Sequence, residues 1–135
     1  MISQDSKKPE KVKVWLDAID HIQVTSPSEV EDEMLFFYGT ILGLTEIPKP
    51  EALKTNSSAW YALGDIQIHV STEKNPNNEA SRRHICFRVG NLDEFAEHLK
   101  GYGVDILRDR QPIPSYHRFY VRDPGRNRIE ILSAK

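Results

Sequence analysis

Four residues whose side chains commonly bind divalent metals occupy matching places in two stretches of the chain. His21 precedes His69 by 48 residues, and His84 precedes Glu130 by 46 residues. The residues that open the two stretches are 63 apart, and the residues that close them are 61 apart. Imidazole nitrogens and carboxylate oxygens bind zinc, iron and related ions. The pattern predicts a duplicated unit in which each copy supplies one metal ligand from its first strand and one from its last.

A less specific interpretation exists for each of these residues taken singly. A histidine on a strand is more often a surface or hydrogen-bonded residue than a ligand, and an exposed pair of Glu130 with Arg128 would contribute at most about 1 kcal/mol. Cys86 is typical of a small buried apolar residue. His98 and His117 fall outside the duplication, and His98 is expected at a solvated helix position. The coincidence of four ligand-type residues at equivalent positions favours the metal site.

Hydrophobic periodicity predicts that two β-α-β-β-β units hold these residues. The first unit is expected to contain a strand ending at Val24, a helix over 29–42 capped by Ser28, and strands over 44–47, 59–63 and 66–70. The second is expected to contain a strand over 84–89, a helix from its cap at Asn91 to Lys100, and strands over 104–107, 118–122 and 128–132. The equal spacing from His21 to Ser28 and from His84 to Asn91 supports the duplication.

The two units together make one domain of α+β class, because 135 residues are the length of a single domain. A polar tail is expected over 1–13 and the domain over 14–135. Within the domain we predict module one at 14–71, a polar connector at 72–82 and module two at 83–133.

Each predicted strand has one apolar and one polar face, since successive side chains on a strand point in opposite directions. In the first strand, Ile22 and Val24 share a face that can pack against a helix, while His21 and Gln23 share the other. If the two units curl into one concave sheet, the polar faces line the inside of a cup.

Composition argues against several classes of protein. A net charge of −2 with mixed signs along the chain argues against a nucleic-acid partner. The longest apolar run is too short for a membrane span, and the polar start lacks the apolar stretch of a secretory signal. A single cysteine, Cys86, excludes an internal disulfide and fits a reducing cytoplasm.

Ordered motifs then connect the chain to a known family. Asp20-His21-Ile22, Phe37-Tyr38 followed by Leu42-Gly43-Leu44, Leu63-Gly64 leading to His69, and the run from Phe119 to Glu130 around Asp123-Pro124-Gly125 occur in that order. With these motifs, residues 17 to 133 resemble the vicinal oxygen chelate superfamily, also called the glyoxalase/bleomycin resistance/dioxygenase family.

The resemblance implies paired βαβββ modules in a cup-shaped, partly open eight-stranded mixed sheet with the helices outside, and a homodimer. It also implies one divalent metal ion per site, iron, zinc, nickel, cobalt or manganese, held by His21, His69, His84 and Glu130. Chelation of two substrate oxygens by such an ion stabilises an enolate or a similar oxyanion. The expected partner is a small oxygenated substrate.

Two enzymatic branches fit this resemblance. In a ring-cleavage dioxygenase-like branch, His21, His84 and Glu130 bind iron, while His69 and Tyr120 act in acid-base and orienting roles. In a lyase-like branch all four residues bind the ion and Glu130 moves a proton. Glyoxalase I usually has a glutamate where this chain has His69, so the sequence departs from that enzyme at one ligand.

The alternative to an enzyme is a metal-free protein that sequesters a ligand, as bleomycin-resistance members of the family do. Aromatic walls for such a cup are available at Trp60, Tyr61, Tyr116 and Tyr120, although one of the neighbours Trp60 and Tyr61 must face the core. The candidates for holding an anion are Arg88, Arg118 and Arg128. The proline-bearing loop from Asp109 to His117 is predicted to cover the mouth of the site.

Overall fold

The computed structural model describes residues 12–54 and 58–134, which form two modules of the same plan. Module one contains β1 (His21–Ser26), α1 (Glu31–Phe36), β2 (Thr45–Ile47), β3 (Ser58–Leu63) and β4 (Ile66–Thr72). Short helical turns at Ser28–Val30 and Phe37–Ile41 flank α1, and another covers Glu51–Leu53. Module two contains β5 (His84–Arg88), α2 (Leu92–Gly101), β6 (Leu107–Arg108), β7 (Tyr116–Arg122) and β8 (Arg128–Ala134).

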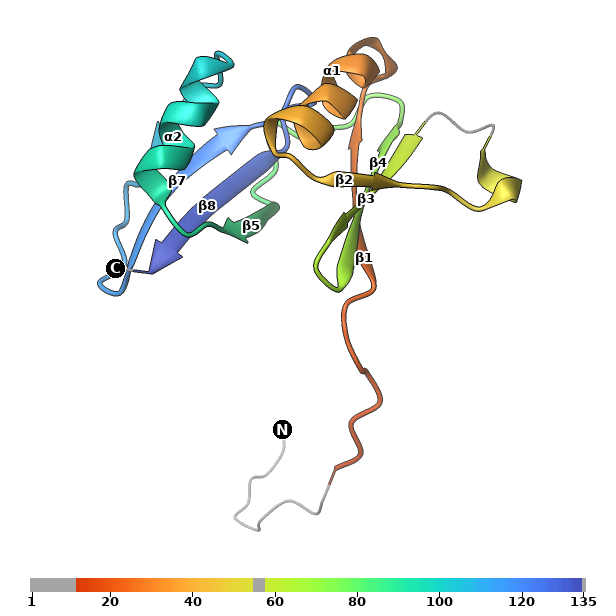
Figure 1. Cartoon of the computed structure of the whole chain (residues 1–135), viewed down its shortest axis with the longest axis horizontal. Coiled ribbons are helices and arrows are strands. Elements are labelled where there is room, and N and C mark those ends of the chain that lie inside the picture. Colours follow the sequence, from red (N-terminus) through yellow and green to blue (C-terminus); the bar gives the residue numbers. More distant parts are fainter. Residues whose placement is uncertain (1–11, 55–57, 135) are drawn as a thin grey trace.

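The strand order is the same in both modules. The first sheet has the order β1-β4-β3-β2 and the second has the order β5-β8-β7-β6, with the first and last strands of each module parallel and adjacent. This arrangement confirms the predicted pair of βαβββ modules. The eight strands are divided between two open four-stranded sheets, and within the described residues no ladder joins β1 to β5. Figure 1 shows the two sheets beside each other with α1 and α2 on the same side.

Local sequence explains most of the element boundaries. The side chain of Asn91 accepts a hydrogen bond of 2.9 Å from the Glu94 amide, as an N-cap residue should. The Gly64-Asp65 turn joins β3 to β4, and Gly64 has a φ of 58° that glycine adopts without steric cost. The prediction of Ser28 as a side-chain cap was wrong, because Ser28 lies inside the first helical turn and Pro27 precedes it.

The apolar faces of the central strands form the core together with the helices. Ile68 on β4 and Ile131 on β8 are both 0% exposed, and Met34 from α1 and Leu99 from α2 are buried against the sheets. Burial of apolar surface is the main favourable contribution to folding. The ligand-type residues lie on the opposite faces, where His21 and His84 are exposed and His69 and Glu130 are each 6% exposed.

The modules meet where the end of β1 contacts the β7–β8 turn. A side chain on Gly125 would come within 2.6 Å of the Ser26 Cβ, so only glycine allows this approach. The Tyr38 hydroxyl donates a 2.7 Å hydrogen bond to the buried Asp123 carboxylate. Burial, followed by the charge and the hydrogen bond of Asp123, raises the pKa of Tyr38 well above its usual value. The Asn78 amide also joins the modules by donating to the carbonyls of Thr25 and Gly125.

Residues 12–20 extend away from the body before β1 begins (Figure 1). Trp15 and Leu16 in this segment are 77% and 85% exposed, and Val12, Val14 and Ile19 are also exposed. The predicted first module began at residue 14, whereas the regular strand begins at His21. Every helix in the described part of the chain is too short or too polar to cross a membrane.

Candidate metal centre

His84 and Glu130 form the better-defined half of the candidate centre. They come from the parallel neighbours β5 and β8, on which Glu130 lies opposite Cys86 and His84 lies opposite Arg128. The His84 Nε2 is 3.1 Å from the Glu130 Oε1, and the two side chains are 36% and 7% exposed. Two donors bound at about 2.1 Å and roughly 90° to one ion lie about 3.0 Å apart. The separation is that of a His–Glu ion pair, and it is also compatible with two donors on one divalent ion.

Hydrogen bonds behind the pair fix both side chains. The His84 Nδ1 lies 3.0 Å from the Arg82 carbonyl oxygen, which leaves Nε2 as the nitrogen nearest to Glu130. The Glu130 Oε2 accepts a 3.2 Å hydrogen bond from the Arg118 Nη1. Residues that orient metal ligands in this way commonly change metal affinity by about 10–100-fold when lost.

Arg118 also ties the Asp109–His117 loop to Glu130. Its Nε donates to the Asp109 Oδ2 at 2.8 Å, and its Nη2 donates to the Gln111 carbonyl at 2.7 Å. The hydrogen bond from Arg118 holds the pKa of Asp109 below its usual value, and the pKa of Arg118 is raised in turn. One guanidinium thus connects the predicted cover loop to a candidate ligand.

Tyr120 and Cys86 flank the same pair. Tyr120 on β7 lies opposite Glu130 in the strand register, and its ring centroid is 6.2 Å from that of His84. The guanidinium of Arg128 lies 4.5 Å from the centre of the Tyr120 ring. Cys86 is exposed on the polar face of the edge strand β5, as strand alternation predicts, and does not follow the burial typical of cysteines.

His21 and His69 form a different arrangement in module one. Their rings are stacked with centroids 4.1 Å apart and planes 14° apart, and Trp60 stacks on the other face of His69 at 3.9 Å. The His69 Nε2 is 2.8 Å from the Gln67 Oε1. Imidazole lone pairs lie in the ring plane, so stacked rings do not direct their nitrogens to a common point. As placed in a single chain, this pair does not form a chelating site.

Burial and the neighbouring His21 both lower the pKa of His69. Asp20 acts in the opposite direction but has the smaller effect, and its Oδ2 is 2.8 Å from the His21 Nδ1. His69 is therefore neutral at pH 7. A neutral imidazole is the form that binds a metal or accepts a proton.

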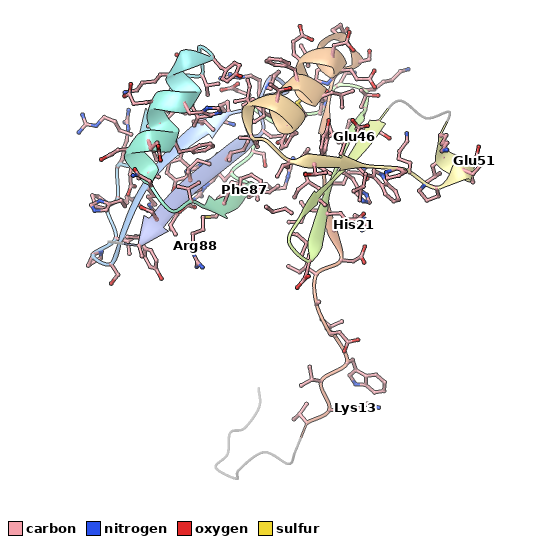
Figure 2. The ribbon with its side chains drawn as sticks, viewed as in Figure 1. Lys13, His21, Glu46, Glu51, Phe87 and Arg88 are labelled. Carbon is pink, nitrogen blue, oxygen red and sulfur yellow. The ribbon has the colours of Figure 1, made fainter. Side chains whose placement is uncertain are left out.

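His21 and His69 border one hollow of the single chain, and His84 borders another. His21 and His69 border a hollow of about 890 Å³ lined by residues of module one and the start of the connector. His84 borders another of about 680 Å³ between β1 and the starts of β5 and β8. Within residues 12–54 and 58–134, no three His, Cys, Asp or Glu side chains gather closely enough to hold one ion. The four predicted ligands thus lie as two pairs, and Figure 2 shows His21 and the second-module residue Arg88 on different modules.

Other predicted residues are distributed between the site and the core. Trp60 is on the polar face, whereas Tyr61 is 2% exposed and donates to the Leu35 carbonyl at 3.2 Å. Burial and then Glu46 raise the pKa of Tyr61 to about 12. Tyr116 and Arg88 are exposed.

His98 is exposed, as expected for a solvated helix position, and it also makes a contact that was not predicted. Its Nε2 is 2.8 Å from the Ile41 carbonyl oxygen, so it links α2 to the helical run of module one. This contact could not be read from helical periodicity, because the acceptor lies in the other module.

Two basic residues near the candidate centre were not singled out from the sequence. Lys49 donates to the Ser58 Oγ at 2.9 Å and borders the hollow of His21 and His69. Arg82 borders the hollow of His84. The available signals were the Pro48-Lys49-Pro50 run after a short strand and the basic pair immediately before His84.

Comparison with known proteins agrees with the fold. The family model described as Glyoxalase/Bleomycin resistance protein/Dioxygenase superfamily matches residues 18–131. The crystal structure of a glyoxalase family protein from Bacillus anthracis is 40% identical, with a TM-score of 0.82, and the match covers 92% of this chain and 100% of that one.

More distant relatives have different activities. Metapyrocatechase of Geobacillus stearothermophilus is 24% identical over 98% of this chain, which spans 41% of that protein. Glyoxylase I 4 of Arabidopsis thaliana is 28% identical over 87% of this chain and 71% of its own length. The fosfomycin resistance protein FosX of Listeria monocytogenes, solved in complex with Mn(II) and a sulfate ion, shares the fold with a TM-score of 0.72 at 17% identity, over 89% of this chain and 92% of that one.

Proposed function

This chain belongs to the glyoxalase/bleomycin resistance protein/dioxygenase superfamily, and from that membership we propose that it is a divalent-metal-dependent enzyme acting on a small oxygenated molecule. The observation that carries the proposal is the 3.1 Å approach of the His84 Nε2 to the Glu130 Oε1 on a polar sheet face. A buried carboxylate supported from behind by an arginine is suited to hold an ion at a defined position.

The complete centre in this proposal combines the pair His84 and Glu130 of one copy with the pair His21 and His69 of a second copy. The His21 and His69 rings would have to turn out of their stack for both to bind the ion. Within one chain His84 borders a different hollow from His21 and His69. The exposed apolar segment 12–19 leads directly into the strand that carries His21. Apolar surface of this kind commonly marks a protein–protein contact. Both observations support a homodimer in which the site is shared.

The bound ion would act as a Lewis acid that polarises substrate oxygens and stabilises negative charge developing on them. The residues of the chain have separate tasks. Glu130 is held by Arg118 with one oxygen directed at His84, and Tyr120 lies beside this pair to orient the substrate and to exchange a proton with it. His69, whose pKa is lowered by burial, serves as a ligand or as a proton acceptor.

Two reaction branches remain within this proposal. The relation to metapyrocatechase supports a dioxygenase-like branch, in which His21, His84 and Glu130 bind iron and His69 stays off the metal. The relation to a glyoxylase I supports a lyase-like branch, in which all four residues bind zinc, nickel, cobalt or manganese. Metal identity separates the branches, because iron is the ion that supports oxygen chemistry.

The experiment is the metal content per chain of untagged protein purified without chelator. We expect about one equivalent of a transition metal in the parent and little in a double variant with His84→Ala and Glu130→Ala. A double variant with His98→Ala and His117→Ala serves as the control, since neither residue belongs to the pairs. Absence of bound metal in the parent, even after incubation with each candidate ion, would contradict the proposal.

A mixing experiment tests whether two copies share the site. One variant carries His21→Ala and His69→Ala, and the other carries His84→Ala and Glu130→Ala. If a two-fold dimer shares its sites, a heterodimer has one intact site, so an equal mixture refolded together regains about one quarter of the parental metal content. If each chain builds its own site, the mixture regains nothing.

The second candidate function is metal-free ligand sequestration, which one observation favours. The rings of Trp60, His69 and His21 form a continuous stack on the open face of module one, with successive centroids 3.9 Å and 4.1 Å apart. A planar ligand could extend such a stack by lying against the ring at one of its ends, Trp60 or His21. Ligand binding by metal-free parent protein with no turnover would favour this function over the enzyme.

A further inference from the structure

The hollow between the modules has a strongly positive lining. Arg82 and Arg83, at the end of the connector, and Arg128, at the start of β8, border it together with His84. Glu73 is the one carboxylate among the described residues that line it, and this side chain accepts a hydrogen bond from the Thr25 hydroxyl. We refer to the hollow bordered by Arg82, Arg83 and Arg128 as the arginine cleft.

The positive charges of the arginine cleft are not compensated within the described part of the chain. Neither Arg82 nor Arg83 forms an ion pair there, and the guanidinium of Arg128 lies over the Tyr120 ring at 4.5 Å. The chain as a whole has a net charge of −2, so this cluster opposes the overall sign. A concave surface lined by like charges concentrates the electrostatic field and attracts ions of opposite sign.

The walls of the cleft add hydrogen-bonding capacity. They are formed by β1 and β5, which are the edge strands of the two sheets and leave one side of each backbone without a strand partner. Guanidinium groups bind carboxylates and phosphoryl groups through paired hydrogen bonds, which a lysine cannot match. The volume of about 680 Å³ is within the range of small-molecule sites.

The arginine cleft adjoins one member of the candidate metal centre, His84, which is among its lining residues. The Arg82 carbonyl oxygen holds the His84 Nδ1 at 3.0 Å, and Arg128 is the residue opposite His84 in the strand register. A molecule whose acidic group lies among the arginines would thus have its remaining atoms beside His84.

We propose that the arginine cleft binds the acidic group of the substrate, and that this group is compact and multiply charged, as in a phosphorylated or dicarboxylic small molecule. The assignment of this anion as substrate rests on the proposed metal-dependent function, whereas anion binding in the cleft does not. Arg82, Arg83 and Arg128 act here as specificity-determining residues, with Arg82 also holding His84 through its backbone.

The test measures binding of inorganic phosphate and of malonate to the full-length protein by calorimetry at constant ionic strength, with acetate as the singly charged reference. We expect saturable binding of phosphate or malonate and at least about tenfold weaker binding of acetate. Preference for phosphate identifies a phosphorylated substrate, and preference for malonate a dicarboxylic one. No saturable binding of either anion, or equal binding of acetate, would overturn the proposal.

Variants locate the binding. The affinity for the preferred anion should fall by about tenfold in each of the variants Arg82→Gln, Arg83→Gln and Arg128→Gln. The control variant Arg108→Gln changes an exposed arginine on β6, and its affinity for the anion should stay within about twofold of the parental value. Equal effects of Arg108→Gln and the cleft variants would refute a localised site. Any glutamine variant that fails to fold is replaced by lysine at the same position, for which partial retention of binding is expected.

Metal content of the same samples separates this inference from the proposed function. Arg83→Gln should lose anion affinity while retaining the parental metal content, because its side chain supports neither His84 nor Glu130. If the protein binds anions but no metal, the proposed anion site is supported and the proposed metal-dependent function is contradicted. If it binds metal but no anion, the metal-dependent function is supported and the anion site is contradicted.

Discussion

The two modules place their ligand-type residues identically on the backbone but orient the side chains differently. In module one, His21 lies opposite Gln67 and His69 lies opposite Gln23. In module two, His84 lies opposite Arg128 and Glu130 lies opposite Cys86. Each pair therefore has the same diagonal offset across two parallel strands. One pair directs a nitrogen and an oxygen toward each other, and the other stacks two rings.

The neighbouring residues explain the difference. Trp60 and Tyr120 occupy equivalent positions opposite His69 and Glu130. Trp60 stacks on the His69 ring and favours a flat arrangement, whereas a carboxylate offers no ring for Tyr120 to stack on.

A second difference lies in the polar link behind each pair. In module one Lys49 donates a hydrogen bond to Ser58, and in module two Arg118 donates one to Asp109. In both modules the two partners are nine residues apart in the sequence. In module two the long arginine on the strand continues to Glu130. The short serine in module one does not reach His69, which pairs with Gln67 instead. The duplication thus determines the backbone position of each candidate ligand. The residues around it determine the direction of its donor atoms.

The largest expected effect comes from Glu130→Gln, which keeps the size of the side chain and removes its charge. Because Glu130 is the only carboxylate of the four candidate ligands, metal affinity should fall by more than the ~10–100-fold that follows loss of a supporting residue. Equilibrium metal titration measures this, with Glu97→Gln on the exposed face of α2 as the control. Parental affinity in Glu130→Gln would mean that the second module does not provide the anionic ligand.

Arg118→Gln should lower metal affinity by about 10–100-fold, because Glu130 loses the group that holds its Oε2. The equivalent change in module one, Ser58→Ala, should lower it less than threefold, since Ser58 contacts Lys49 and not His69. Both are measured by the same metal titration. Equal losses in the two variants would remove the distinction between the supports of the two pairs.

Gly125→Ala tests whether the modules depend on each other. The added methyl group would meet the Ser26 Cβ at 2.6 Å, so the free energy of unfolding should fall by about 1–3 kcal/mol. Gly90→Ala is the control, because nothing lies within 4 Å of an added Cβ there. Chemical denaturation followed by Trp fluorescence and by circular dichroism should show one shared transition. Two separate transitions would show that the modules fold independently.

The smallest expected effect concerns acid stability. Since the pKa of Asp109 is lowered in the folded protein, its contribution is complete above the unfolded pKa and is lost as the pH falls through the folded pKa. Asp109→Asn should therefore be less stable than the parent near pH 7, and the difference should shrink as the pH falls below about 4. Thermal unfolding across this range measures it. Lys49→Met in module one should show no such convergence, because lysine does not titrate in acid.

Much of the fold was predictable, because the signals that specify it are local. Asn91 began its helix as expected, and the Gly64-Asp65 turn joined its strands as expected. Contacts with partners distant in the chain were not predictable. His98 is exposed as expected, but its contact with the Ile41 carbonyl was not foreseen. Cys86 is exposed on the polar face that strand alternation gives it, although cysteines are typically buried.

The sequence predicted which strand faces the candidate ligands share, but not how those residues are placed relative to one another. Strand alternation places His21, His69, His84 and Glu130 on polar faces, and the structure has each of them there. Alternation does not determine how two sheets are oriented, so it did not predict that the four residues would lie as two pairs in one chain.

The sequence alone sufficed for the family, the two βαβββ modules and the faces that carry the chemistry, because these follow from side-chain periodicity and from motifs within a few residues of each other. The tertiary structure was needed for three other features: the contrast between stacked and converging pairs, the link from Asp109 through Arg118 to Glu130, and the arginine cleft between β1 and β5. Each of these depends on distances between segments separated along the chain, and those distances are set by how helices and sheets pack.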